Sequence, residues 1–189
     1  MPNHSGVNRP IRKTDHLRKG RHSVAGARYF ITIVTKNRIA GLTNPPVRHG
    51  IHDQWRALHR SGDFIFHCGT VMPDHVHLLF SLGERLQLSR LIAKFKSLAN
   101  GALKDAGLQW QDNFFDHRLR PDVCMEPFSR YVFLNPYRKG LISLNEEWIG
   151  WVRNRNYVPE FSENLREGKY PNPEWLADQV PLQDLINRS

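Results

Sequence analysis

Cysteine is scarce in this chain, which has only Cys68 and Cys124 among its 189 residues. Two isolated cysteines exclude a disulfide framework and a cysteine-rich zinc site. The sequence also lacks any apolar run near the ~20 residues that span a bilayer, and its first residues are polar and basic rather than signal-like. These absences disfavour a membrane or secreted protein, and we expect a protein of the reducing cytoplasm.

Acidic residues are nearly absent from the first third of the chain. Residues 1–60 hold twelve lysines and arginines against Asp15 and Asp53, a net charge of +10. Residues 61–189 hold fifteen basic and sixteen acidic residues, a net charge of −1. Such an excess is typical of a protein that binds a polyanion, and nucleic acid is the favoured partner. The alternative is a solvated basic tail that only aids solubility.

Hydrophobic residues make up 40% of the chain and aromatic residues 11%, which is typical of a folded protein. We expect a flexible basic arm over residues 1–26, a folded domain over 27–145 and a C-terminal extension over 146–189. Within the domain, the patterns predict strands at 27–35, 63–71, 74–82 and 113–119, and helices at 47–59, 86–106 and 128–134.

This order of elements is β-α-β-β-α-β followed by one more helix. It predicts an α+β fold of the ferredoxin-like, split βαβ type. The sheet should be antiparallel, with helices on one face, and the additional helix should carry Tyr131.

Two histidines lie inside the predicted strand 74–82. Because side chains alternate along a strand, His75 and His77 should share one face while Val76 points to the other. Imidazoles at this spacing, with Cα atoms roughly 6–7 Å apart, can bind one divalent ion together. A His-x-His pair also arises by chance in a chain with ten histidines, so surface or hydrogen-bonded histidines remain the alternative.

A second group lies on the predicted helix 128–134 and the residues after it. Tyr131 and Asn135 are four residues apart and should share a helix face. The Asn135 carbonyl could complete a His/His/oxygen site for Mg²⁺ or Mn²⁺. A tyrosine is a poor nucleophile unless its phenolate is stabilised. Alternatively, Tyr131 is an ordinary half-buried tyrosine and Asn135 ends the helix, since Pro136 disfavours a helical conformation at the residue before it.

Together these groups resemble the REP-associated tyrosine transposases, within the single-tyrosine HUH transposases. The resemblance covers about residues 25–145, and the order of its parts, a histidine pair before a tyrosine with asparagine four residues later, matches that group. Its segments are Tyr29–Thr35, Arg38, Met72-Pro73-Asp74, His75-Val76-His77, Trp110-Gln111, Phe114, Asp116-His117, Arg120, Tyr131-x-x-x-Asn135-Pro136 and Gly140-Leu141.

The resemblance implies that residues 27–145 form an HUH catalytic domain that cleaves and rejoins single-stranded DNA at REP-like palindromic hairpins. Tyr131 would attack a phosphodiester and form a 5′-phosphotyrosine link. His75, His77 and Asn135 would hold a divalent metal, Mg²⁺ or Mn²⁺. It also implies a prokaryotic, nucleoid-associated protein in the cytoplasm, acting as a monomer, with a dimer left open.

Basic residues in two regions are the candidate DNA contacts: Arg12, Lys13, Arg18, Lys19 and Arg21 in the arm, and His117, Arg118 and Arg120 in the last predicted strand and after it. For His117, pairing with Asp116 is the alternative. The extension mixes aromatic and basic residues, which suits either a base-stacking platform or a core: Trp148, Trp151, Arg153, Arg155 and Tyr157.

Two other functions stay open. One is a non-catalytic module that binds hairpin DNA; the presence of both histidines, the tyrosine and the asparagine argues against it. The other is a metal-dependent nuclease that uses water as its nucleophile. Two-histidine phosphoesterases of that kind usually repeat a His-x-Ser/Thr pair, and here the residue two positions after His75 is another histidine.

Overall fold

A five-stranded antiparallel sheet forms the centre of the protein, with strand order β4-β1-β3-β2-β5. The computed structural model describes residues 23–177 and 180–189. The strands are β1 (Arg28–Val34), β2 (Phe64–Val71), β3 (His75–Leu82), β4 (Phe115–Arg118) and β5 (Trp151–Arg153). The helices are η2 (Lys36–Arg38), α1 (Pro45–Arg60), α2 (Leu88–Asp105), α3 (Glu126–Arg138), η3 (Glu160–Asn164), α4 (Glu174–Ala177) and α5 (Leu182–Asn187).

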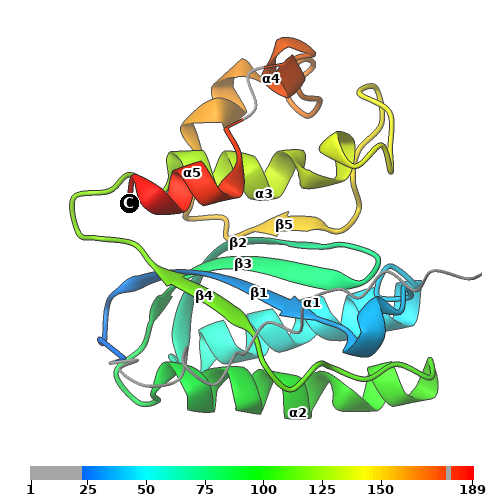
Figure 1. Cartoon of the computed structure of the whole chain (residues 1–189), viewed down its shortest axis with the longest axis vertical. Coiled ribbons are helices and arrows are strands. Elements are labelled where there is room, and N and C mark those ends of the chain that lie inside the picture. The colour runs from blue at the N-terminus through cyan, green and yellow to red at the C-terminus, as the bar shows by residue number, and fades with distance from the viewer. Residues whose placement is uncertain (1–22, 178–179) are drawn as a thin grey trace, which may run out of the picture.

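The predicted α+β fold is confirmed: the chain follows the βαββαβ order, with α1 and α2 together on one face of the sheet (Figure 1). The helix that carries Tyr131, α3, covers the opposite face, together with α5 (Figure 1). The molecule therefore has three layers. Residues 1–22, which make up most of the predicted basic arm, lie outside the described residues.

The alternation of side chains along β1 explains both cores. Tyr29, Ile31 and Ile33 belong to the buried cluster beneath α1 and α2, whereas Phe30 belongs to the cluster beneath α3. Successive strand residues point to opposite faces, so a strand in the middle of three layers must be apolar on both. Trp55 of α1 is the largest side chain of the first cluster and is 1% exposed.

The central position of β3 fixes the histidine pair. His77 lies opposite Thr32 of β1 on one side and Thr70 of β2 on the other. A tight turn joins β2 to β3, closed by a hydrogen bond from the Met72 N–H to the His75 carbonyl at 2.8 Å. The backbone of this segment is therefore held from both neighbouring strands.

Helix α3 is longer than the sequence predicts. It does not end at Asn135 but passes through Pro136 to Arg138, so the interpretation of Asn135 as a helix end is wrong. A proline inside a helix loses its own N–H bond to the residue four positions earlier. The helix resumes after it, because the Lys139 N–H donates to the Asn135 carbonyl at 3.1 Å.

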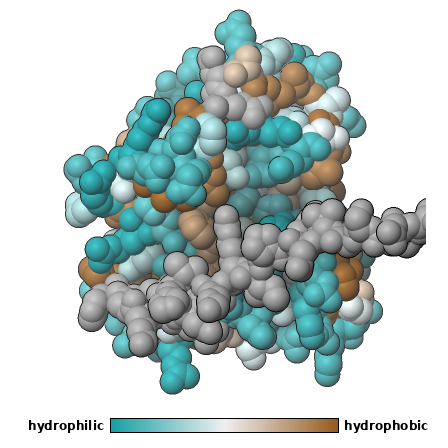
Figure 2. All heavy atoms as spheres, in the orientation of Figure 1, coloured by the Kyte–Doolittle hydropathy of each residue, from teal (hydrophilic) through white to brown (hydrophobic). Residues whose placement is uncertain are grey.

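Polar side chains cover most of the face seen in Figure 2, and hydrophobic residues appear there only in small, separate patches. Among the helices of the described residues, none combines the length and the apolar character needed to cross a membrane.

Gly69 of β2 permits a close approach between the sheet and α1. A methyl group at this position would lie 2.8 Å from the His77 carbonyl oxygen and 3.1 Å from the Trp55 ring. We therefore expect Gly69→Ala to lower the free energy of unfolding by about 1–3 kcal/mol, measured by urea denaturation.

Gly101→Ala is the matched control, because a methyl group there meets no atom within 4 Å and the residue lies in α2. This variant should gain about 0.5–1 kcal/mol from the higher helix propensity of alanine. Equal stability of the Gly69 variant and the wild type would contradict the close packing of Trp55 on β2.

Candidate active site

The two histidines of β3 point to the same face, toward α3. Their Nε2 atoms are 3.1 Å apart, and the rings are nearly perpendicular, with centroids 4.7 Å apart. Val76 between them is completely buried in the cluster beneath α1 and α2. The period-two alternation of the strand thus places both imidazoles together, as their spacing predicts.

Hydrogen bonds to the outer ring nitrogens orient both rings. The His75 Nδ1 lies 2.6 Å from Asp74 Oδ1, and the His77 Nδ1 lies 2.9 Å from Thr32 Oγ1. Arg38 donates to the other Asp74 oxygen at 3.0 Å. Metal-binding histidines commonly use one nitrogen in this way and leave the other for the ion.

Burial favours the neutral form of both imidazoles. It lowers the pKa of His77 well below its ordinary value, and the nearby His75 and Arg38 act in the same direction. It also lowers the pKa of His75, although Asp74 partly opposes this effect. A neutral imidazole that donates through Nδ1 carries a lone pair on Nε2, which is the form that binds metal ions.

Asn135 of α3 completes this group. Its Nδ2 lies 3.1 Å from His77 Nε2, and its Oδ1 is buried with no hydrogen-bond partner among the described residues. A buried amide oxygen without a partner is costly. Rotation of the amide by half a turn would bring that oxygen to the histidine nitrogens.

These groups fit a divalent cation. Two facing lone pairs repel unless a cation or proton lies between them, and 3.1 Å matches the spacing of neighbouring ligands in an octahedral shell, about 3 Å. Two imidazole nitrogens and one amide oxygen can bind Mg²⁺ or Mn²⁺, although a set of carboxylates would bind these ions more tightly. In residues 23–177 and 180–189, no three His, Cys, Asp or Glu side chains gather into a metal-binding group.

Tyr131 lies beside the histidine pair. Its ring is edge-on to His77, with centroids 5.6 Å apart, and its hydroxyl forms a hydrogen bond with Asn135. The guanidinium carbon of Arg138 lies 5.2 Å from the ring centroid. Burial raises the pKa of the Tyr131 phenol, while the Arg138 charge and the Asn135 bond oppose that rise. The structure therefore brings together all four residues predicted for catalysis and metal binding.

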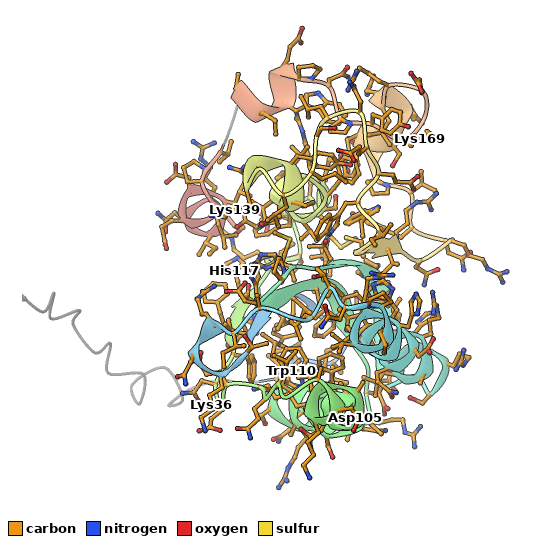
Figure 3. All side chains as sticks on the ribbon, turned by 90° about the vertical axis from the view of Figure 1, so that its right-hand side faces the viewer. Lys36, Asp105, Trp110, His117, Lys139 and Lys169 are labelled. Carbon is orange, nitrogen blue, oxygen red and sulfur yellow. The ribbon has the colours of Figure 1, made fainter. Side chains whose placement is uncertain are left out.

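Two of the three candidate DNA contacts in and after β4 form hydrogen bonds with C-terminal residues. His117 Nε2 forms a hydrogen bond with the Ser189 hydroxyl at 2.6 Å, and the ring stacks on Phe128. In Figure 3 it lies at the boundary between the sheet and the α3 layer. Arg120 donates to the Arg188 carbonyl at 3.0 Å, whereas Arg118 is exposed.

The five arm residues predicted to bind DNA, Arg12, Lys13, Arg18, Lys19 and Arg21, lie outside the described residues.

The aromatic residues of the extension form a core. Trp148 and Trp151 pack with Phe133 and Phe161 of the third buried cluster. The Trp148 indole N–H donates to Thr70 Oγ1 at 3.1 Å, next to β3. Between the two interpretations left open by the sequence, the aromatic residues thus belong to the core, and the exposed arginines Arg153 and Arg155 are left at the surface.

Three residues that orient the group, Asp74, Thr32 and Arg138, were not predicted as site residues. Asp74 immediately precedes the histidines, which is a usable signal. Thr32 reaches His77 only through the register of β1 and β3, and that register cannot be read from a local pattern. Arg138 faces Tyr131 because α3 continues past Pro136.

Comparison with known proteins gives the family. Residues 23–119, just over half of the chain, match the protein-family model described as Transposase IS200 like. This range contains His75 and His77 and ends before α3.

A protein of Haemophilus influenzae whose name assigns it to the REP-associated tyrosine transposases is 24% identical over 142 residues, covering 65% of this chain and 77% of its own length. A solved REP-associated tyrosine transposase, bound to a REP hairpin, shares the fold with a TM-score of 0.57 and 24% identity, covering 69% of this chain and 79% of that one. The chain therefore belongs to the IS200-like transposase family, and its resemblance to the REP-associated tyrosine transposases is the one that its sequence predicts.

Proposed function

We propose that this protein cleaves and rejoins single-stranded DNA at palindromic hairpins, with Tyr131 as the nucleophile. The observation that carries the proposal is the convergence of four side chains from β3 and α3: the His75 and His77 Nε2 atoms, the Asn135 amide and the Tyr131 phenol. A nuclease that uses water has no need of a tyrosine beside its metal ligands.

In the cleavage step, Tyr131 Oη attacks the scissile phosphorus and a new P–O bond forms. The bond from phosphorus to the 3′ oxygen breaks, the phenol loses its proton and the released 3′ oxygen gains one. The 5′ end remains on Tyr131 as a phosphotyrosine. Attack by a 3′-hydroxyl on this link reverses the exchange, so the bond energy is conserved for rejoining.

His75, His77 and Asn135 would hold the divalent ion, Mg²⁺ or Mn²⁺. When bound, such an ion offsets the charge that develops on a non-bridging phosphate oxygen. Asp74 and Thr32 act as positioning residues, because they hold the Nε2 atoms of the two histidines toward one point. Arg138 favours the phenolate form of Tyr131 by its charge.

Hairpin DNA is the proposed partner because the solved relative is bound to a REP hairpin and this chain carries a net charge of +9. One chain supplies both the histidine pair and the tyrosine, so a monomer contains the whole proposed site. The substrate is DNA, so we also propose that the protein works at the nucleoid.

Tyr131→Phe should abolish the covalent protein–DNA species seen on SDS gels, while stem-loop binding stays within about twofold, because only the attacking oxygen is lost. The assay uses a labelled single-stranded stem-loop taken from inverted repeats beside the reading frame, with Mn²⁺.

Tyr137→Phe is the matched control for this experiment. Tyr137 lies on the same helix, but its hydroxyl donates to the Glu146 carbonyl at 2.9 Å, so this variant should keep the adduct. Cleavage without an adduct in the wild type would point to a water nuclease, and binding without any cleavage would point to a non-catalytic module.

Asp74→Asn should weaken Mn²⁺ binding and cleavage by about 10–100-fold, because the carboxylate that orients His75 is lost. Isothermal titration with Mn²⁺ measures the first effect and strand cleavage the second. Asp53→Asn removes an exposed carboxylate on α1 and should change neither. Unchanged Mn²⁺ affinity in the Asp74 variant would contradict the proposed metal site.

A further inference from the structure

A basic groove lies between α1 and the end of β5, and the proposed reaction does not use it. We call it the α1–β5 groove; its volume is about 700 Å³. In Figure 3, β5 lies directly above α1 on the right of the molecule. The groove is lined by residues of α1, of the sheet and of the loop after β5. Those on α1 are His52, Trp55, Arg56, His59 and Arg60, and the others are Phe66, Val152, Arg153, Asn154, Arg155 and Asn156.

The charge of the α1–β5 groove is almost uncompensated. Four of its lining residues are arginines and none is acidic. Arg56 pairs with Asp53 at 2.9 Å, but both side chains are more than half exposed, so this pair is weak. Among the described residues, no carboxylate forms an ion pair with Arg60, Arg153 or Arg155.

Asn154 holds the two sides of the groove together. Its backbone N–H donates to the His67 carbonyl at 2.8 Å, where β2 has an irregular register. Its side-chain Nδ2 donates to the Phe66 carbonyl at 3.0 Å and lies 3.1 Å from His59 Nε2 on α1. The end of β5, which carries Arg153, and the loop after it, which carries Arg155, are therefore fixed against α1.

These bonds also fix the proton on His59. The Phe66 carbonyl can only accept, so the Asn154 atom facing it is the nitrogen, and the His59 Nε2 beside that nitrogen must accept as well. The His59 Nδ1 then carries the proton. This N–H and the Trp55 indole N–H have no hydrogen-bond partner among the described residues. Both atoms are buried, so they do not face a ligand in the groove, and its ligand-binding surface is the arginine side chains.

The α1–β5 groove is distinct from the proposed active site. His75 and His77 point toward α3, whereas Trp55 and Val152 of the groove pack with the cluster beneath α1 and α2. The strand β2 lies between β3 and β5. A ligand in the groove therefore contacts the protein on the other side of the sheet from Tyr131.

We propose that the α1–β5 groove is a second DNA-binding site, which holds the sugar–phosphate backbone of the substrate outside the segment that is cleaved. Four guanidiniums, with no acidic lining residue, suit phosphate oxygens. The identity of the polyanion rests on the proposed function, whereas the presence of a phosphate-binding groove does not.

The test is the double variant Arg60→Glu/Arg155→Glu, compared with Arg90→Glu/Lys104→Glu, which makes the same charge change at exposed positions of α2. The probe is a labelled stem-loop with long single-stranded flanks, and its affinity is measured by fluorescence anisotropy over a range of salt concentrations. We expect at least a tenfold loss for the groove variant and less than a threefold loss for the control. The salt slope should fall by about 0.7 for each lost contact with a single strand.

A second probe separates this inference from the proposed function. The groove variant should still cleave a minimal stem-loop without long flanks at the wild-type rate. If the wild type cleaves nothing, the proposed function fails while the difference in affinity still supports the groove. Equal losses in the two double variants, or a loss of minimal-substrate cleavage in the groove variant, would overturn the inference. If thermal unfolding shows that the double variant is less stable than the wild type, Arg155→Ala, which truncates one exposed side chain, is used in its place.

Discussion

The candidate site depends on two imidazole nitrogens that face each other across 3.1 Å in a buried environment. When both rings carry their proton on Nδ1, the two Nε2 lone pairs face each other and repel, and burial disfavours the charged ring that a second proton would create. The arrangement persists because Asp74 and Thr32 hold the far side of each ring and because β3 is paired on both edges. In the proposed metal site, a divalent cation would remove this repulsion.

The α3 layer brings the remaining chemistry to the histidines. Phe128 of α3 packs against Phe30 of β1, and Phe30 also contacts the Tyr131 ring edge-on. This packing sets the height of the helix over the sheet. Since Asn135 is one turn after Tyr131, the same helix face delivers the amide and the phenol together. A few apolar contacts therefore determine whether the polar groups meet.

Short-period patterns in the sequence were sufficient to predict much of this structure. The alternation in β1 and the His-x-His pair in β3 each predicted which side chains share a face, and the order of the elements predicted the fold. The end of α3 could not be placed correctly, because Pro136 locally disfavours a helical conformation at Asn135, whereas buried packing sustains the helix to Arg138. β5 has only three residues and owes its position to pairing with β2 and to Asn154, neither of which leaves a periodic signal. His59 and Asn154 are 95 residues apart, so the groove that they join has no local pattern at all.

At Gly69, a side chain of the α1 layer comes close to the backbone of β3. The space that its missing side chain leaves is shared by the His77 backbone carbonyl and by the indole of Trp55, which also lines the α1–β5 groove. One aromatic ring and one strand thus lie between the α1–β5 groove and His77. A side chain at this position would push both the groove wall and the backbone that carries His77, so the close packing of the two depends on glycine here.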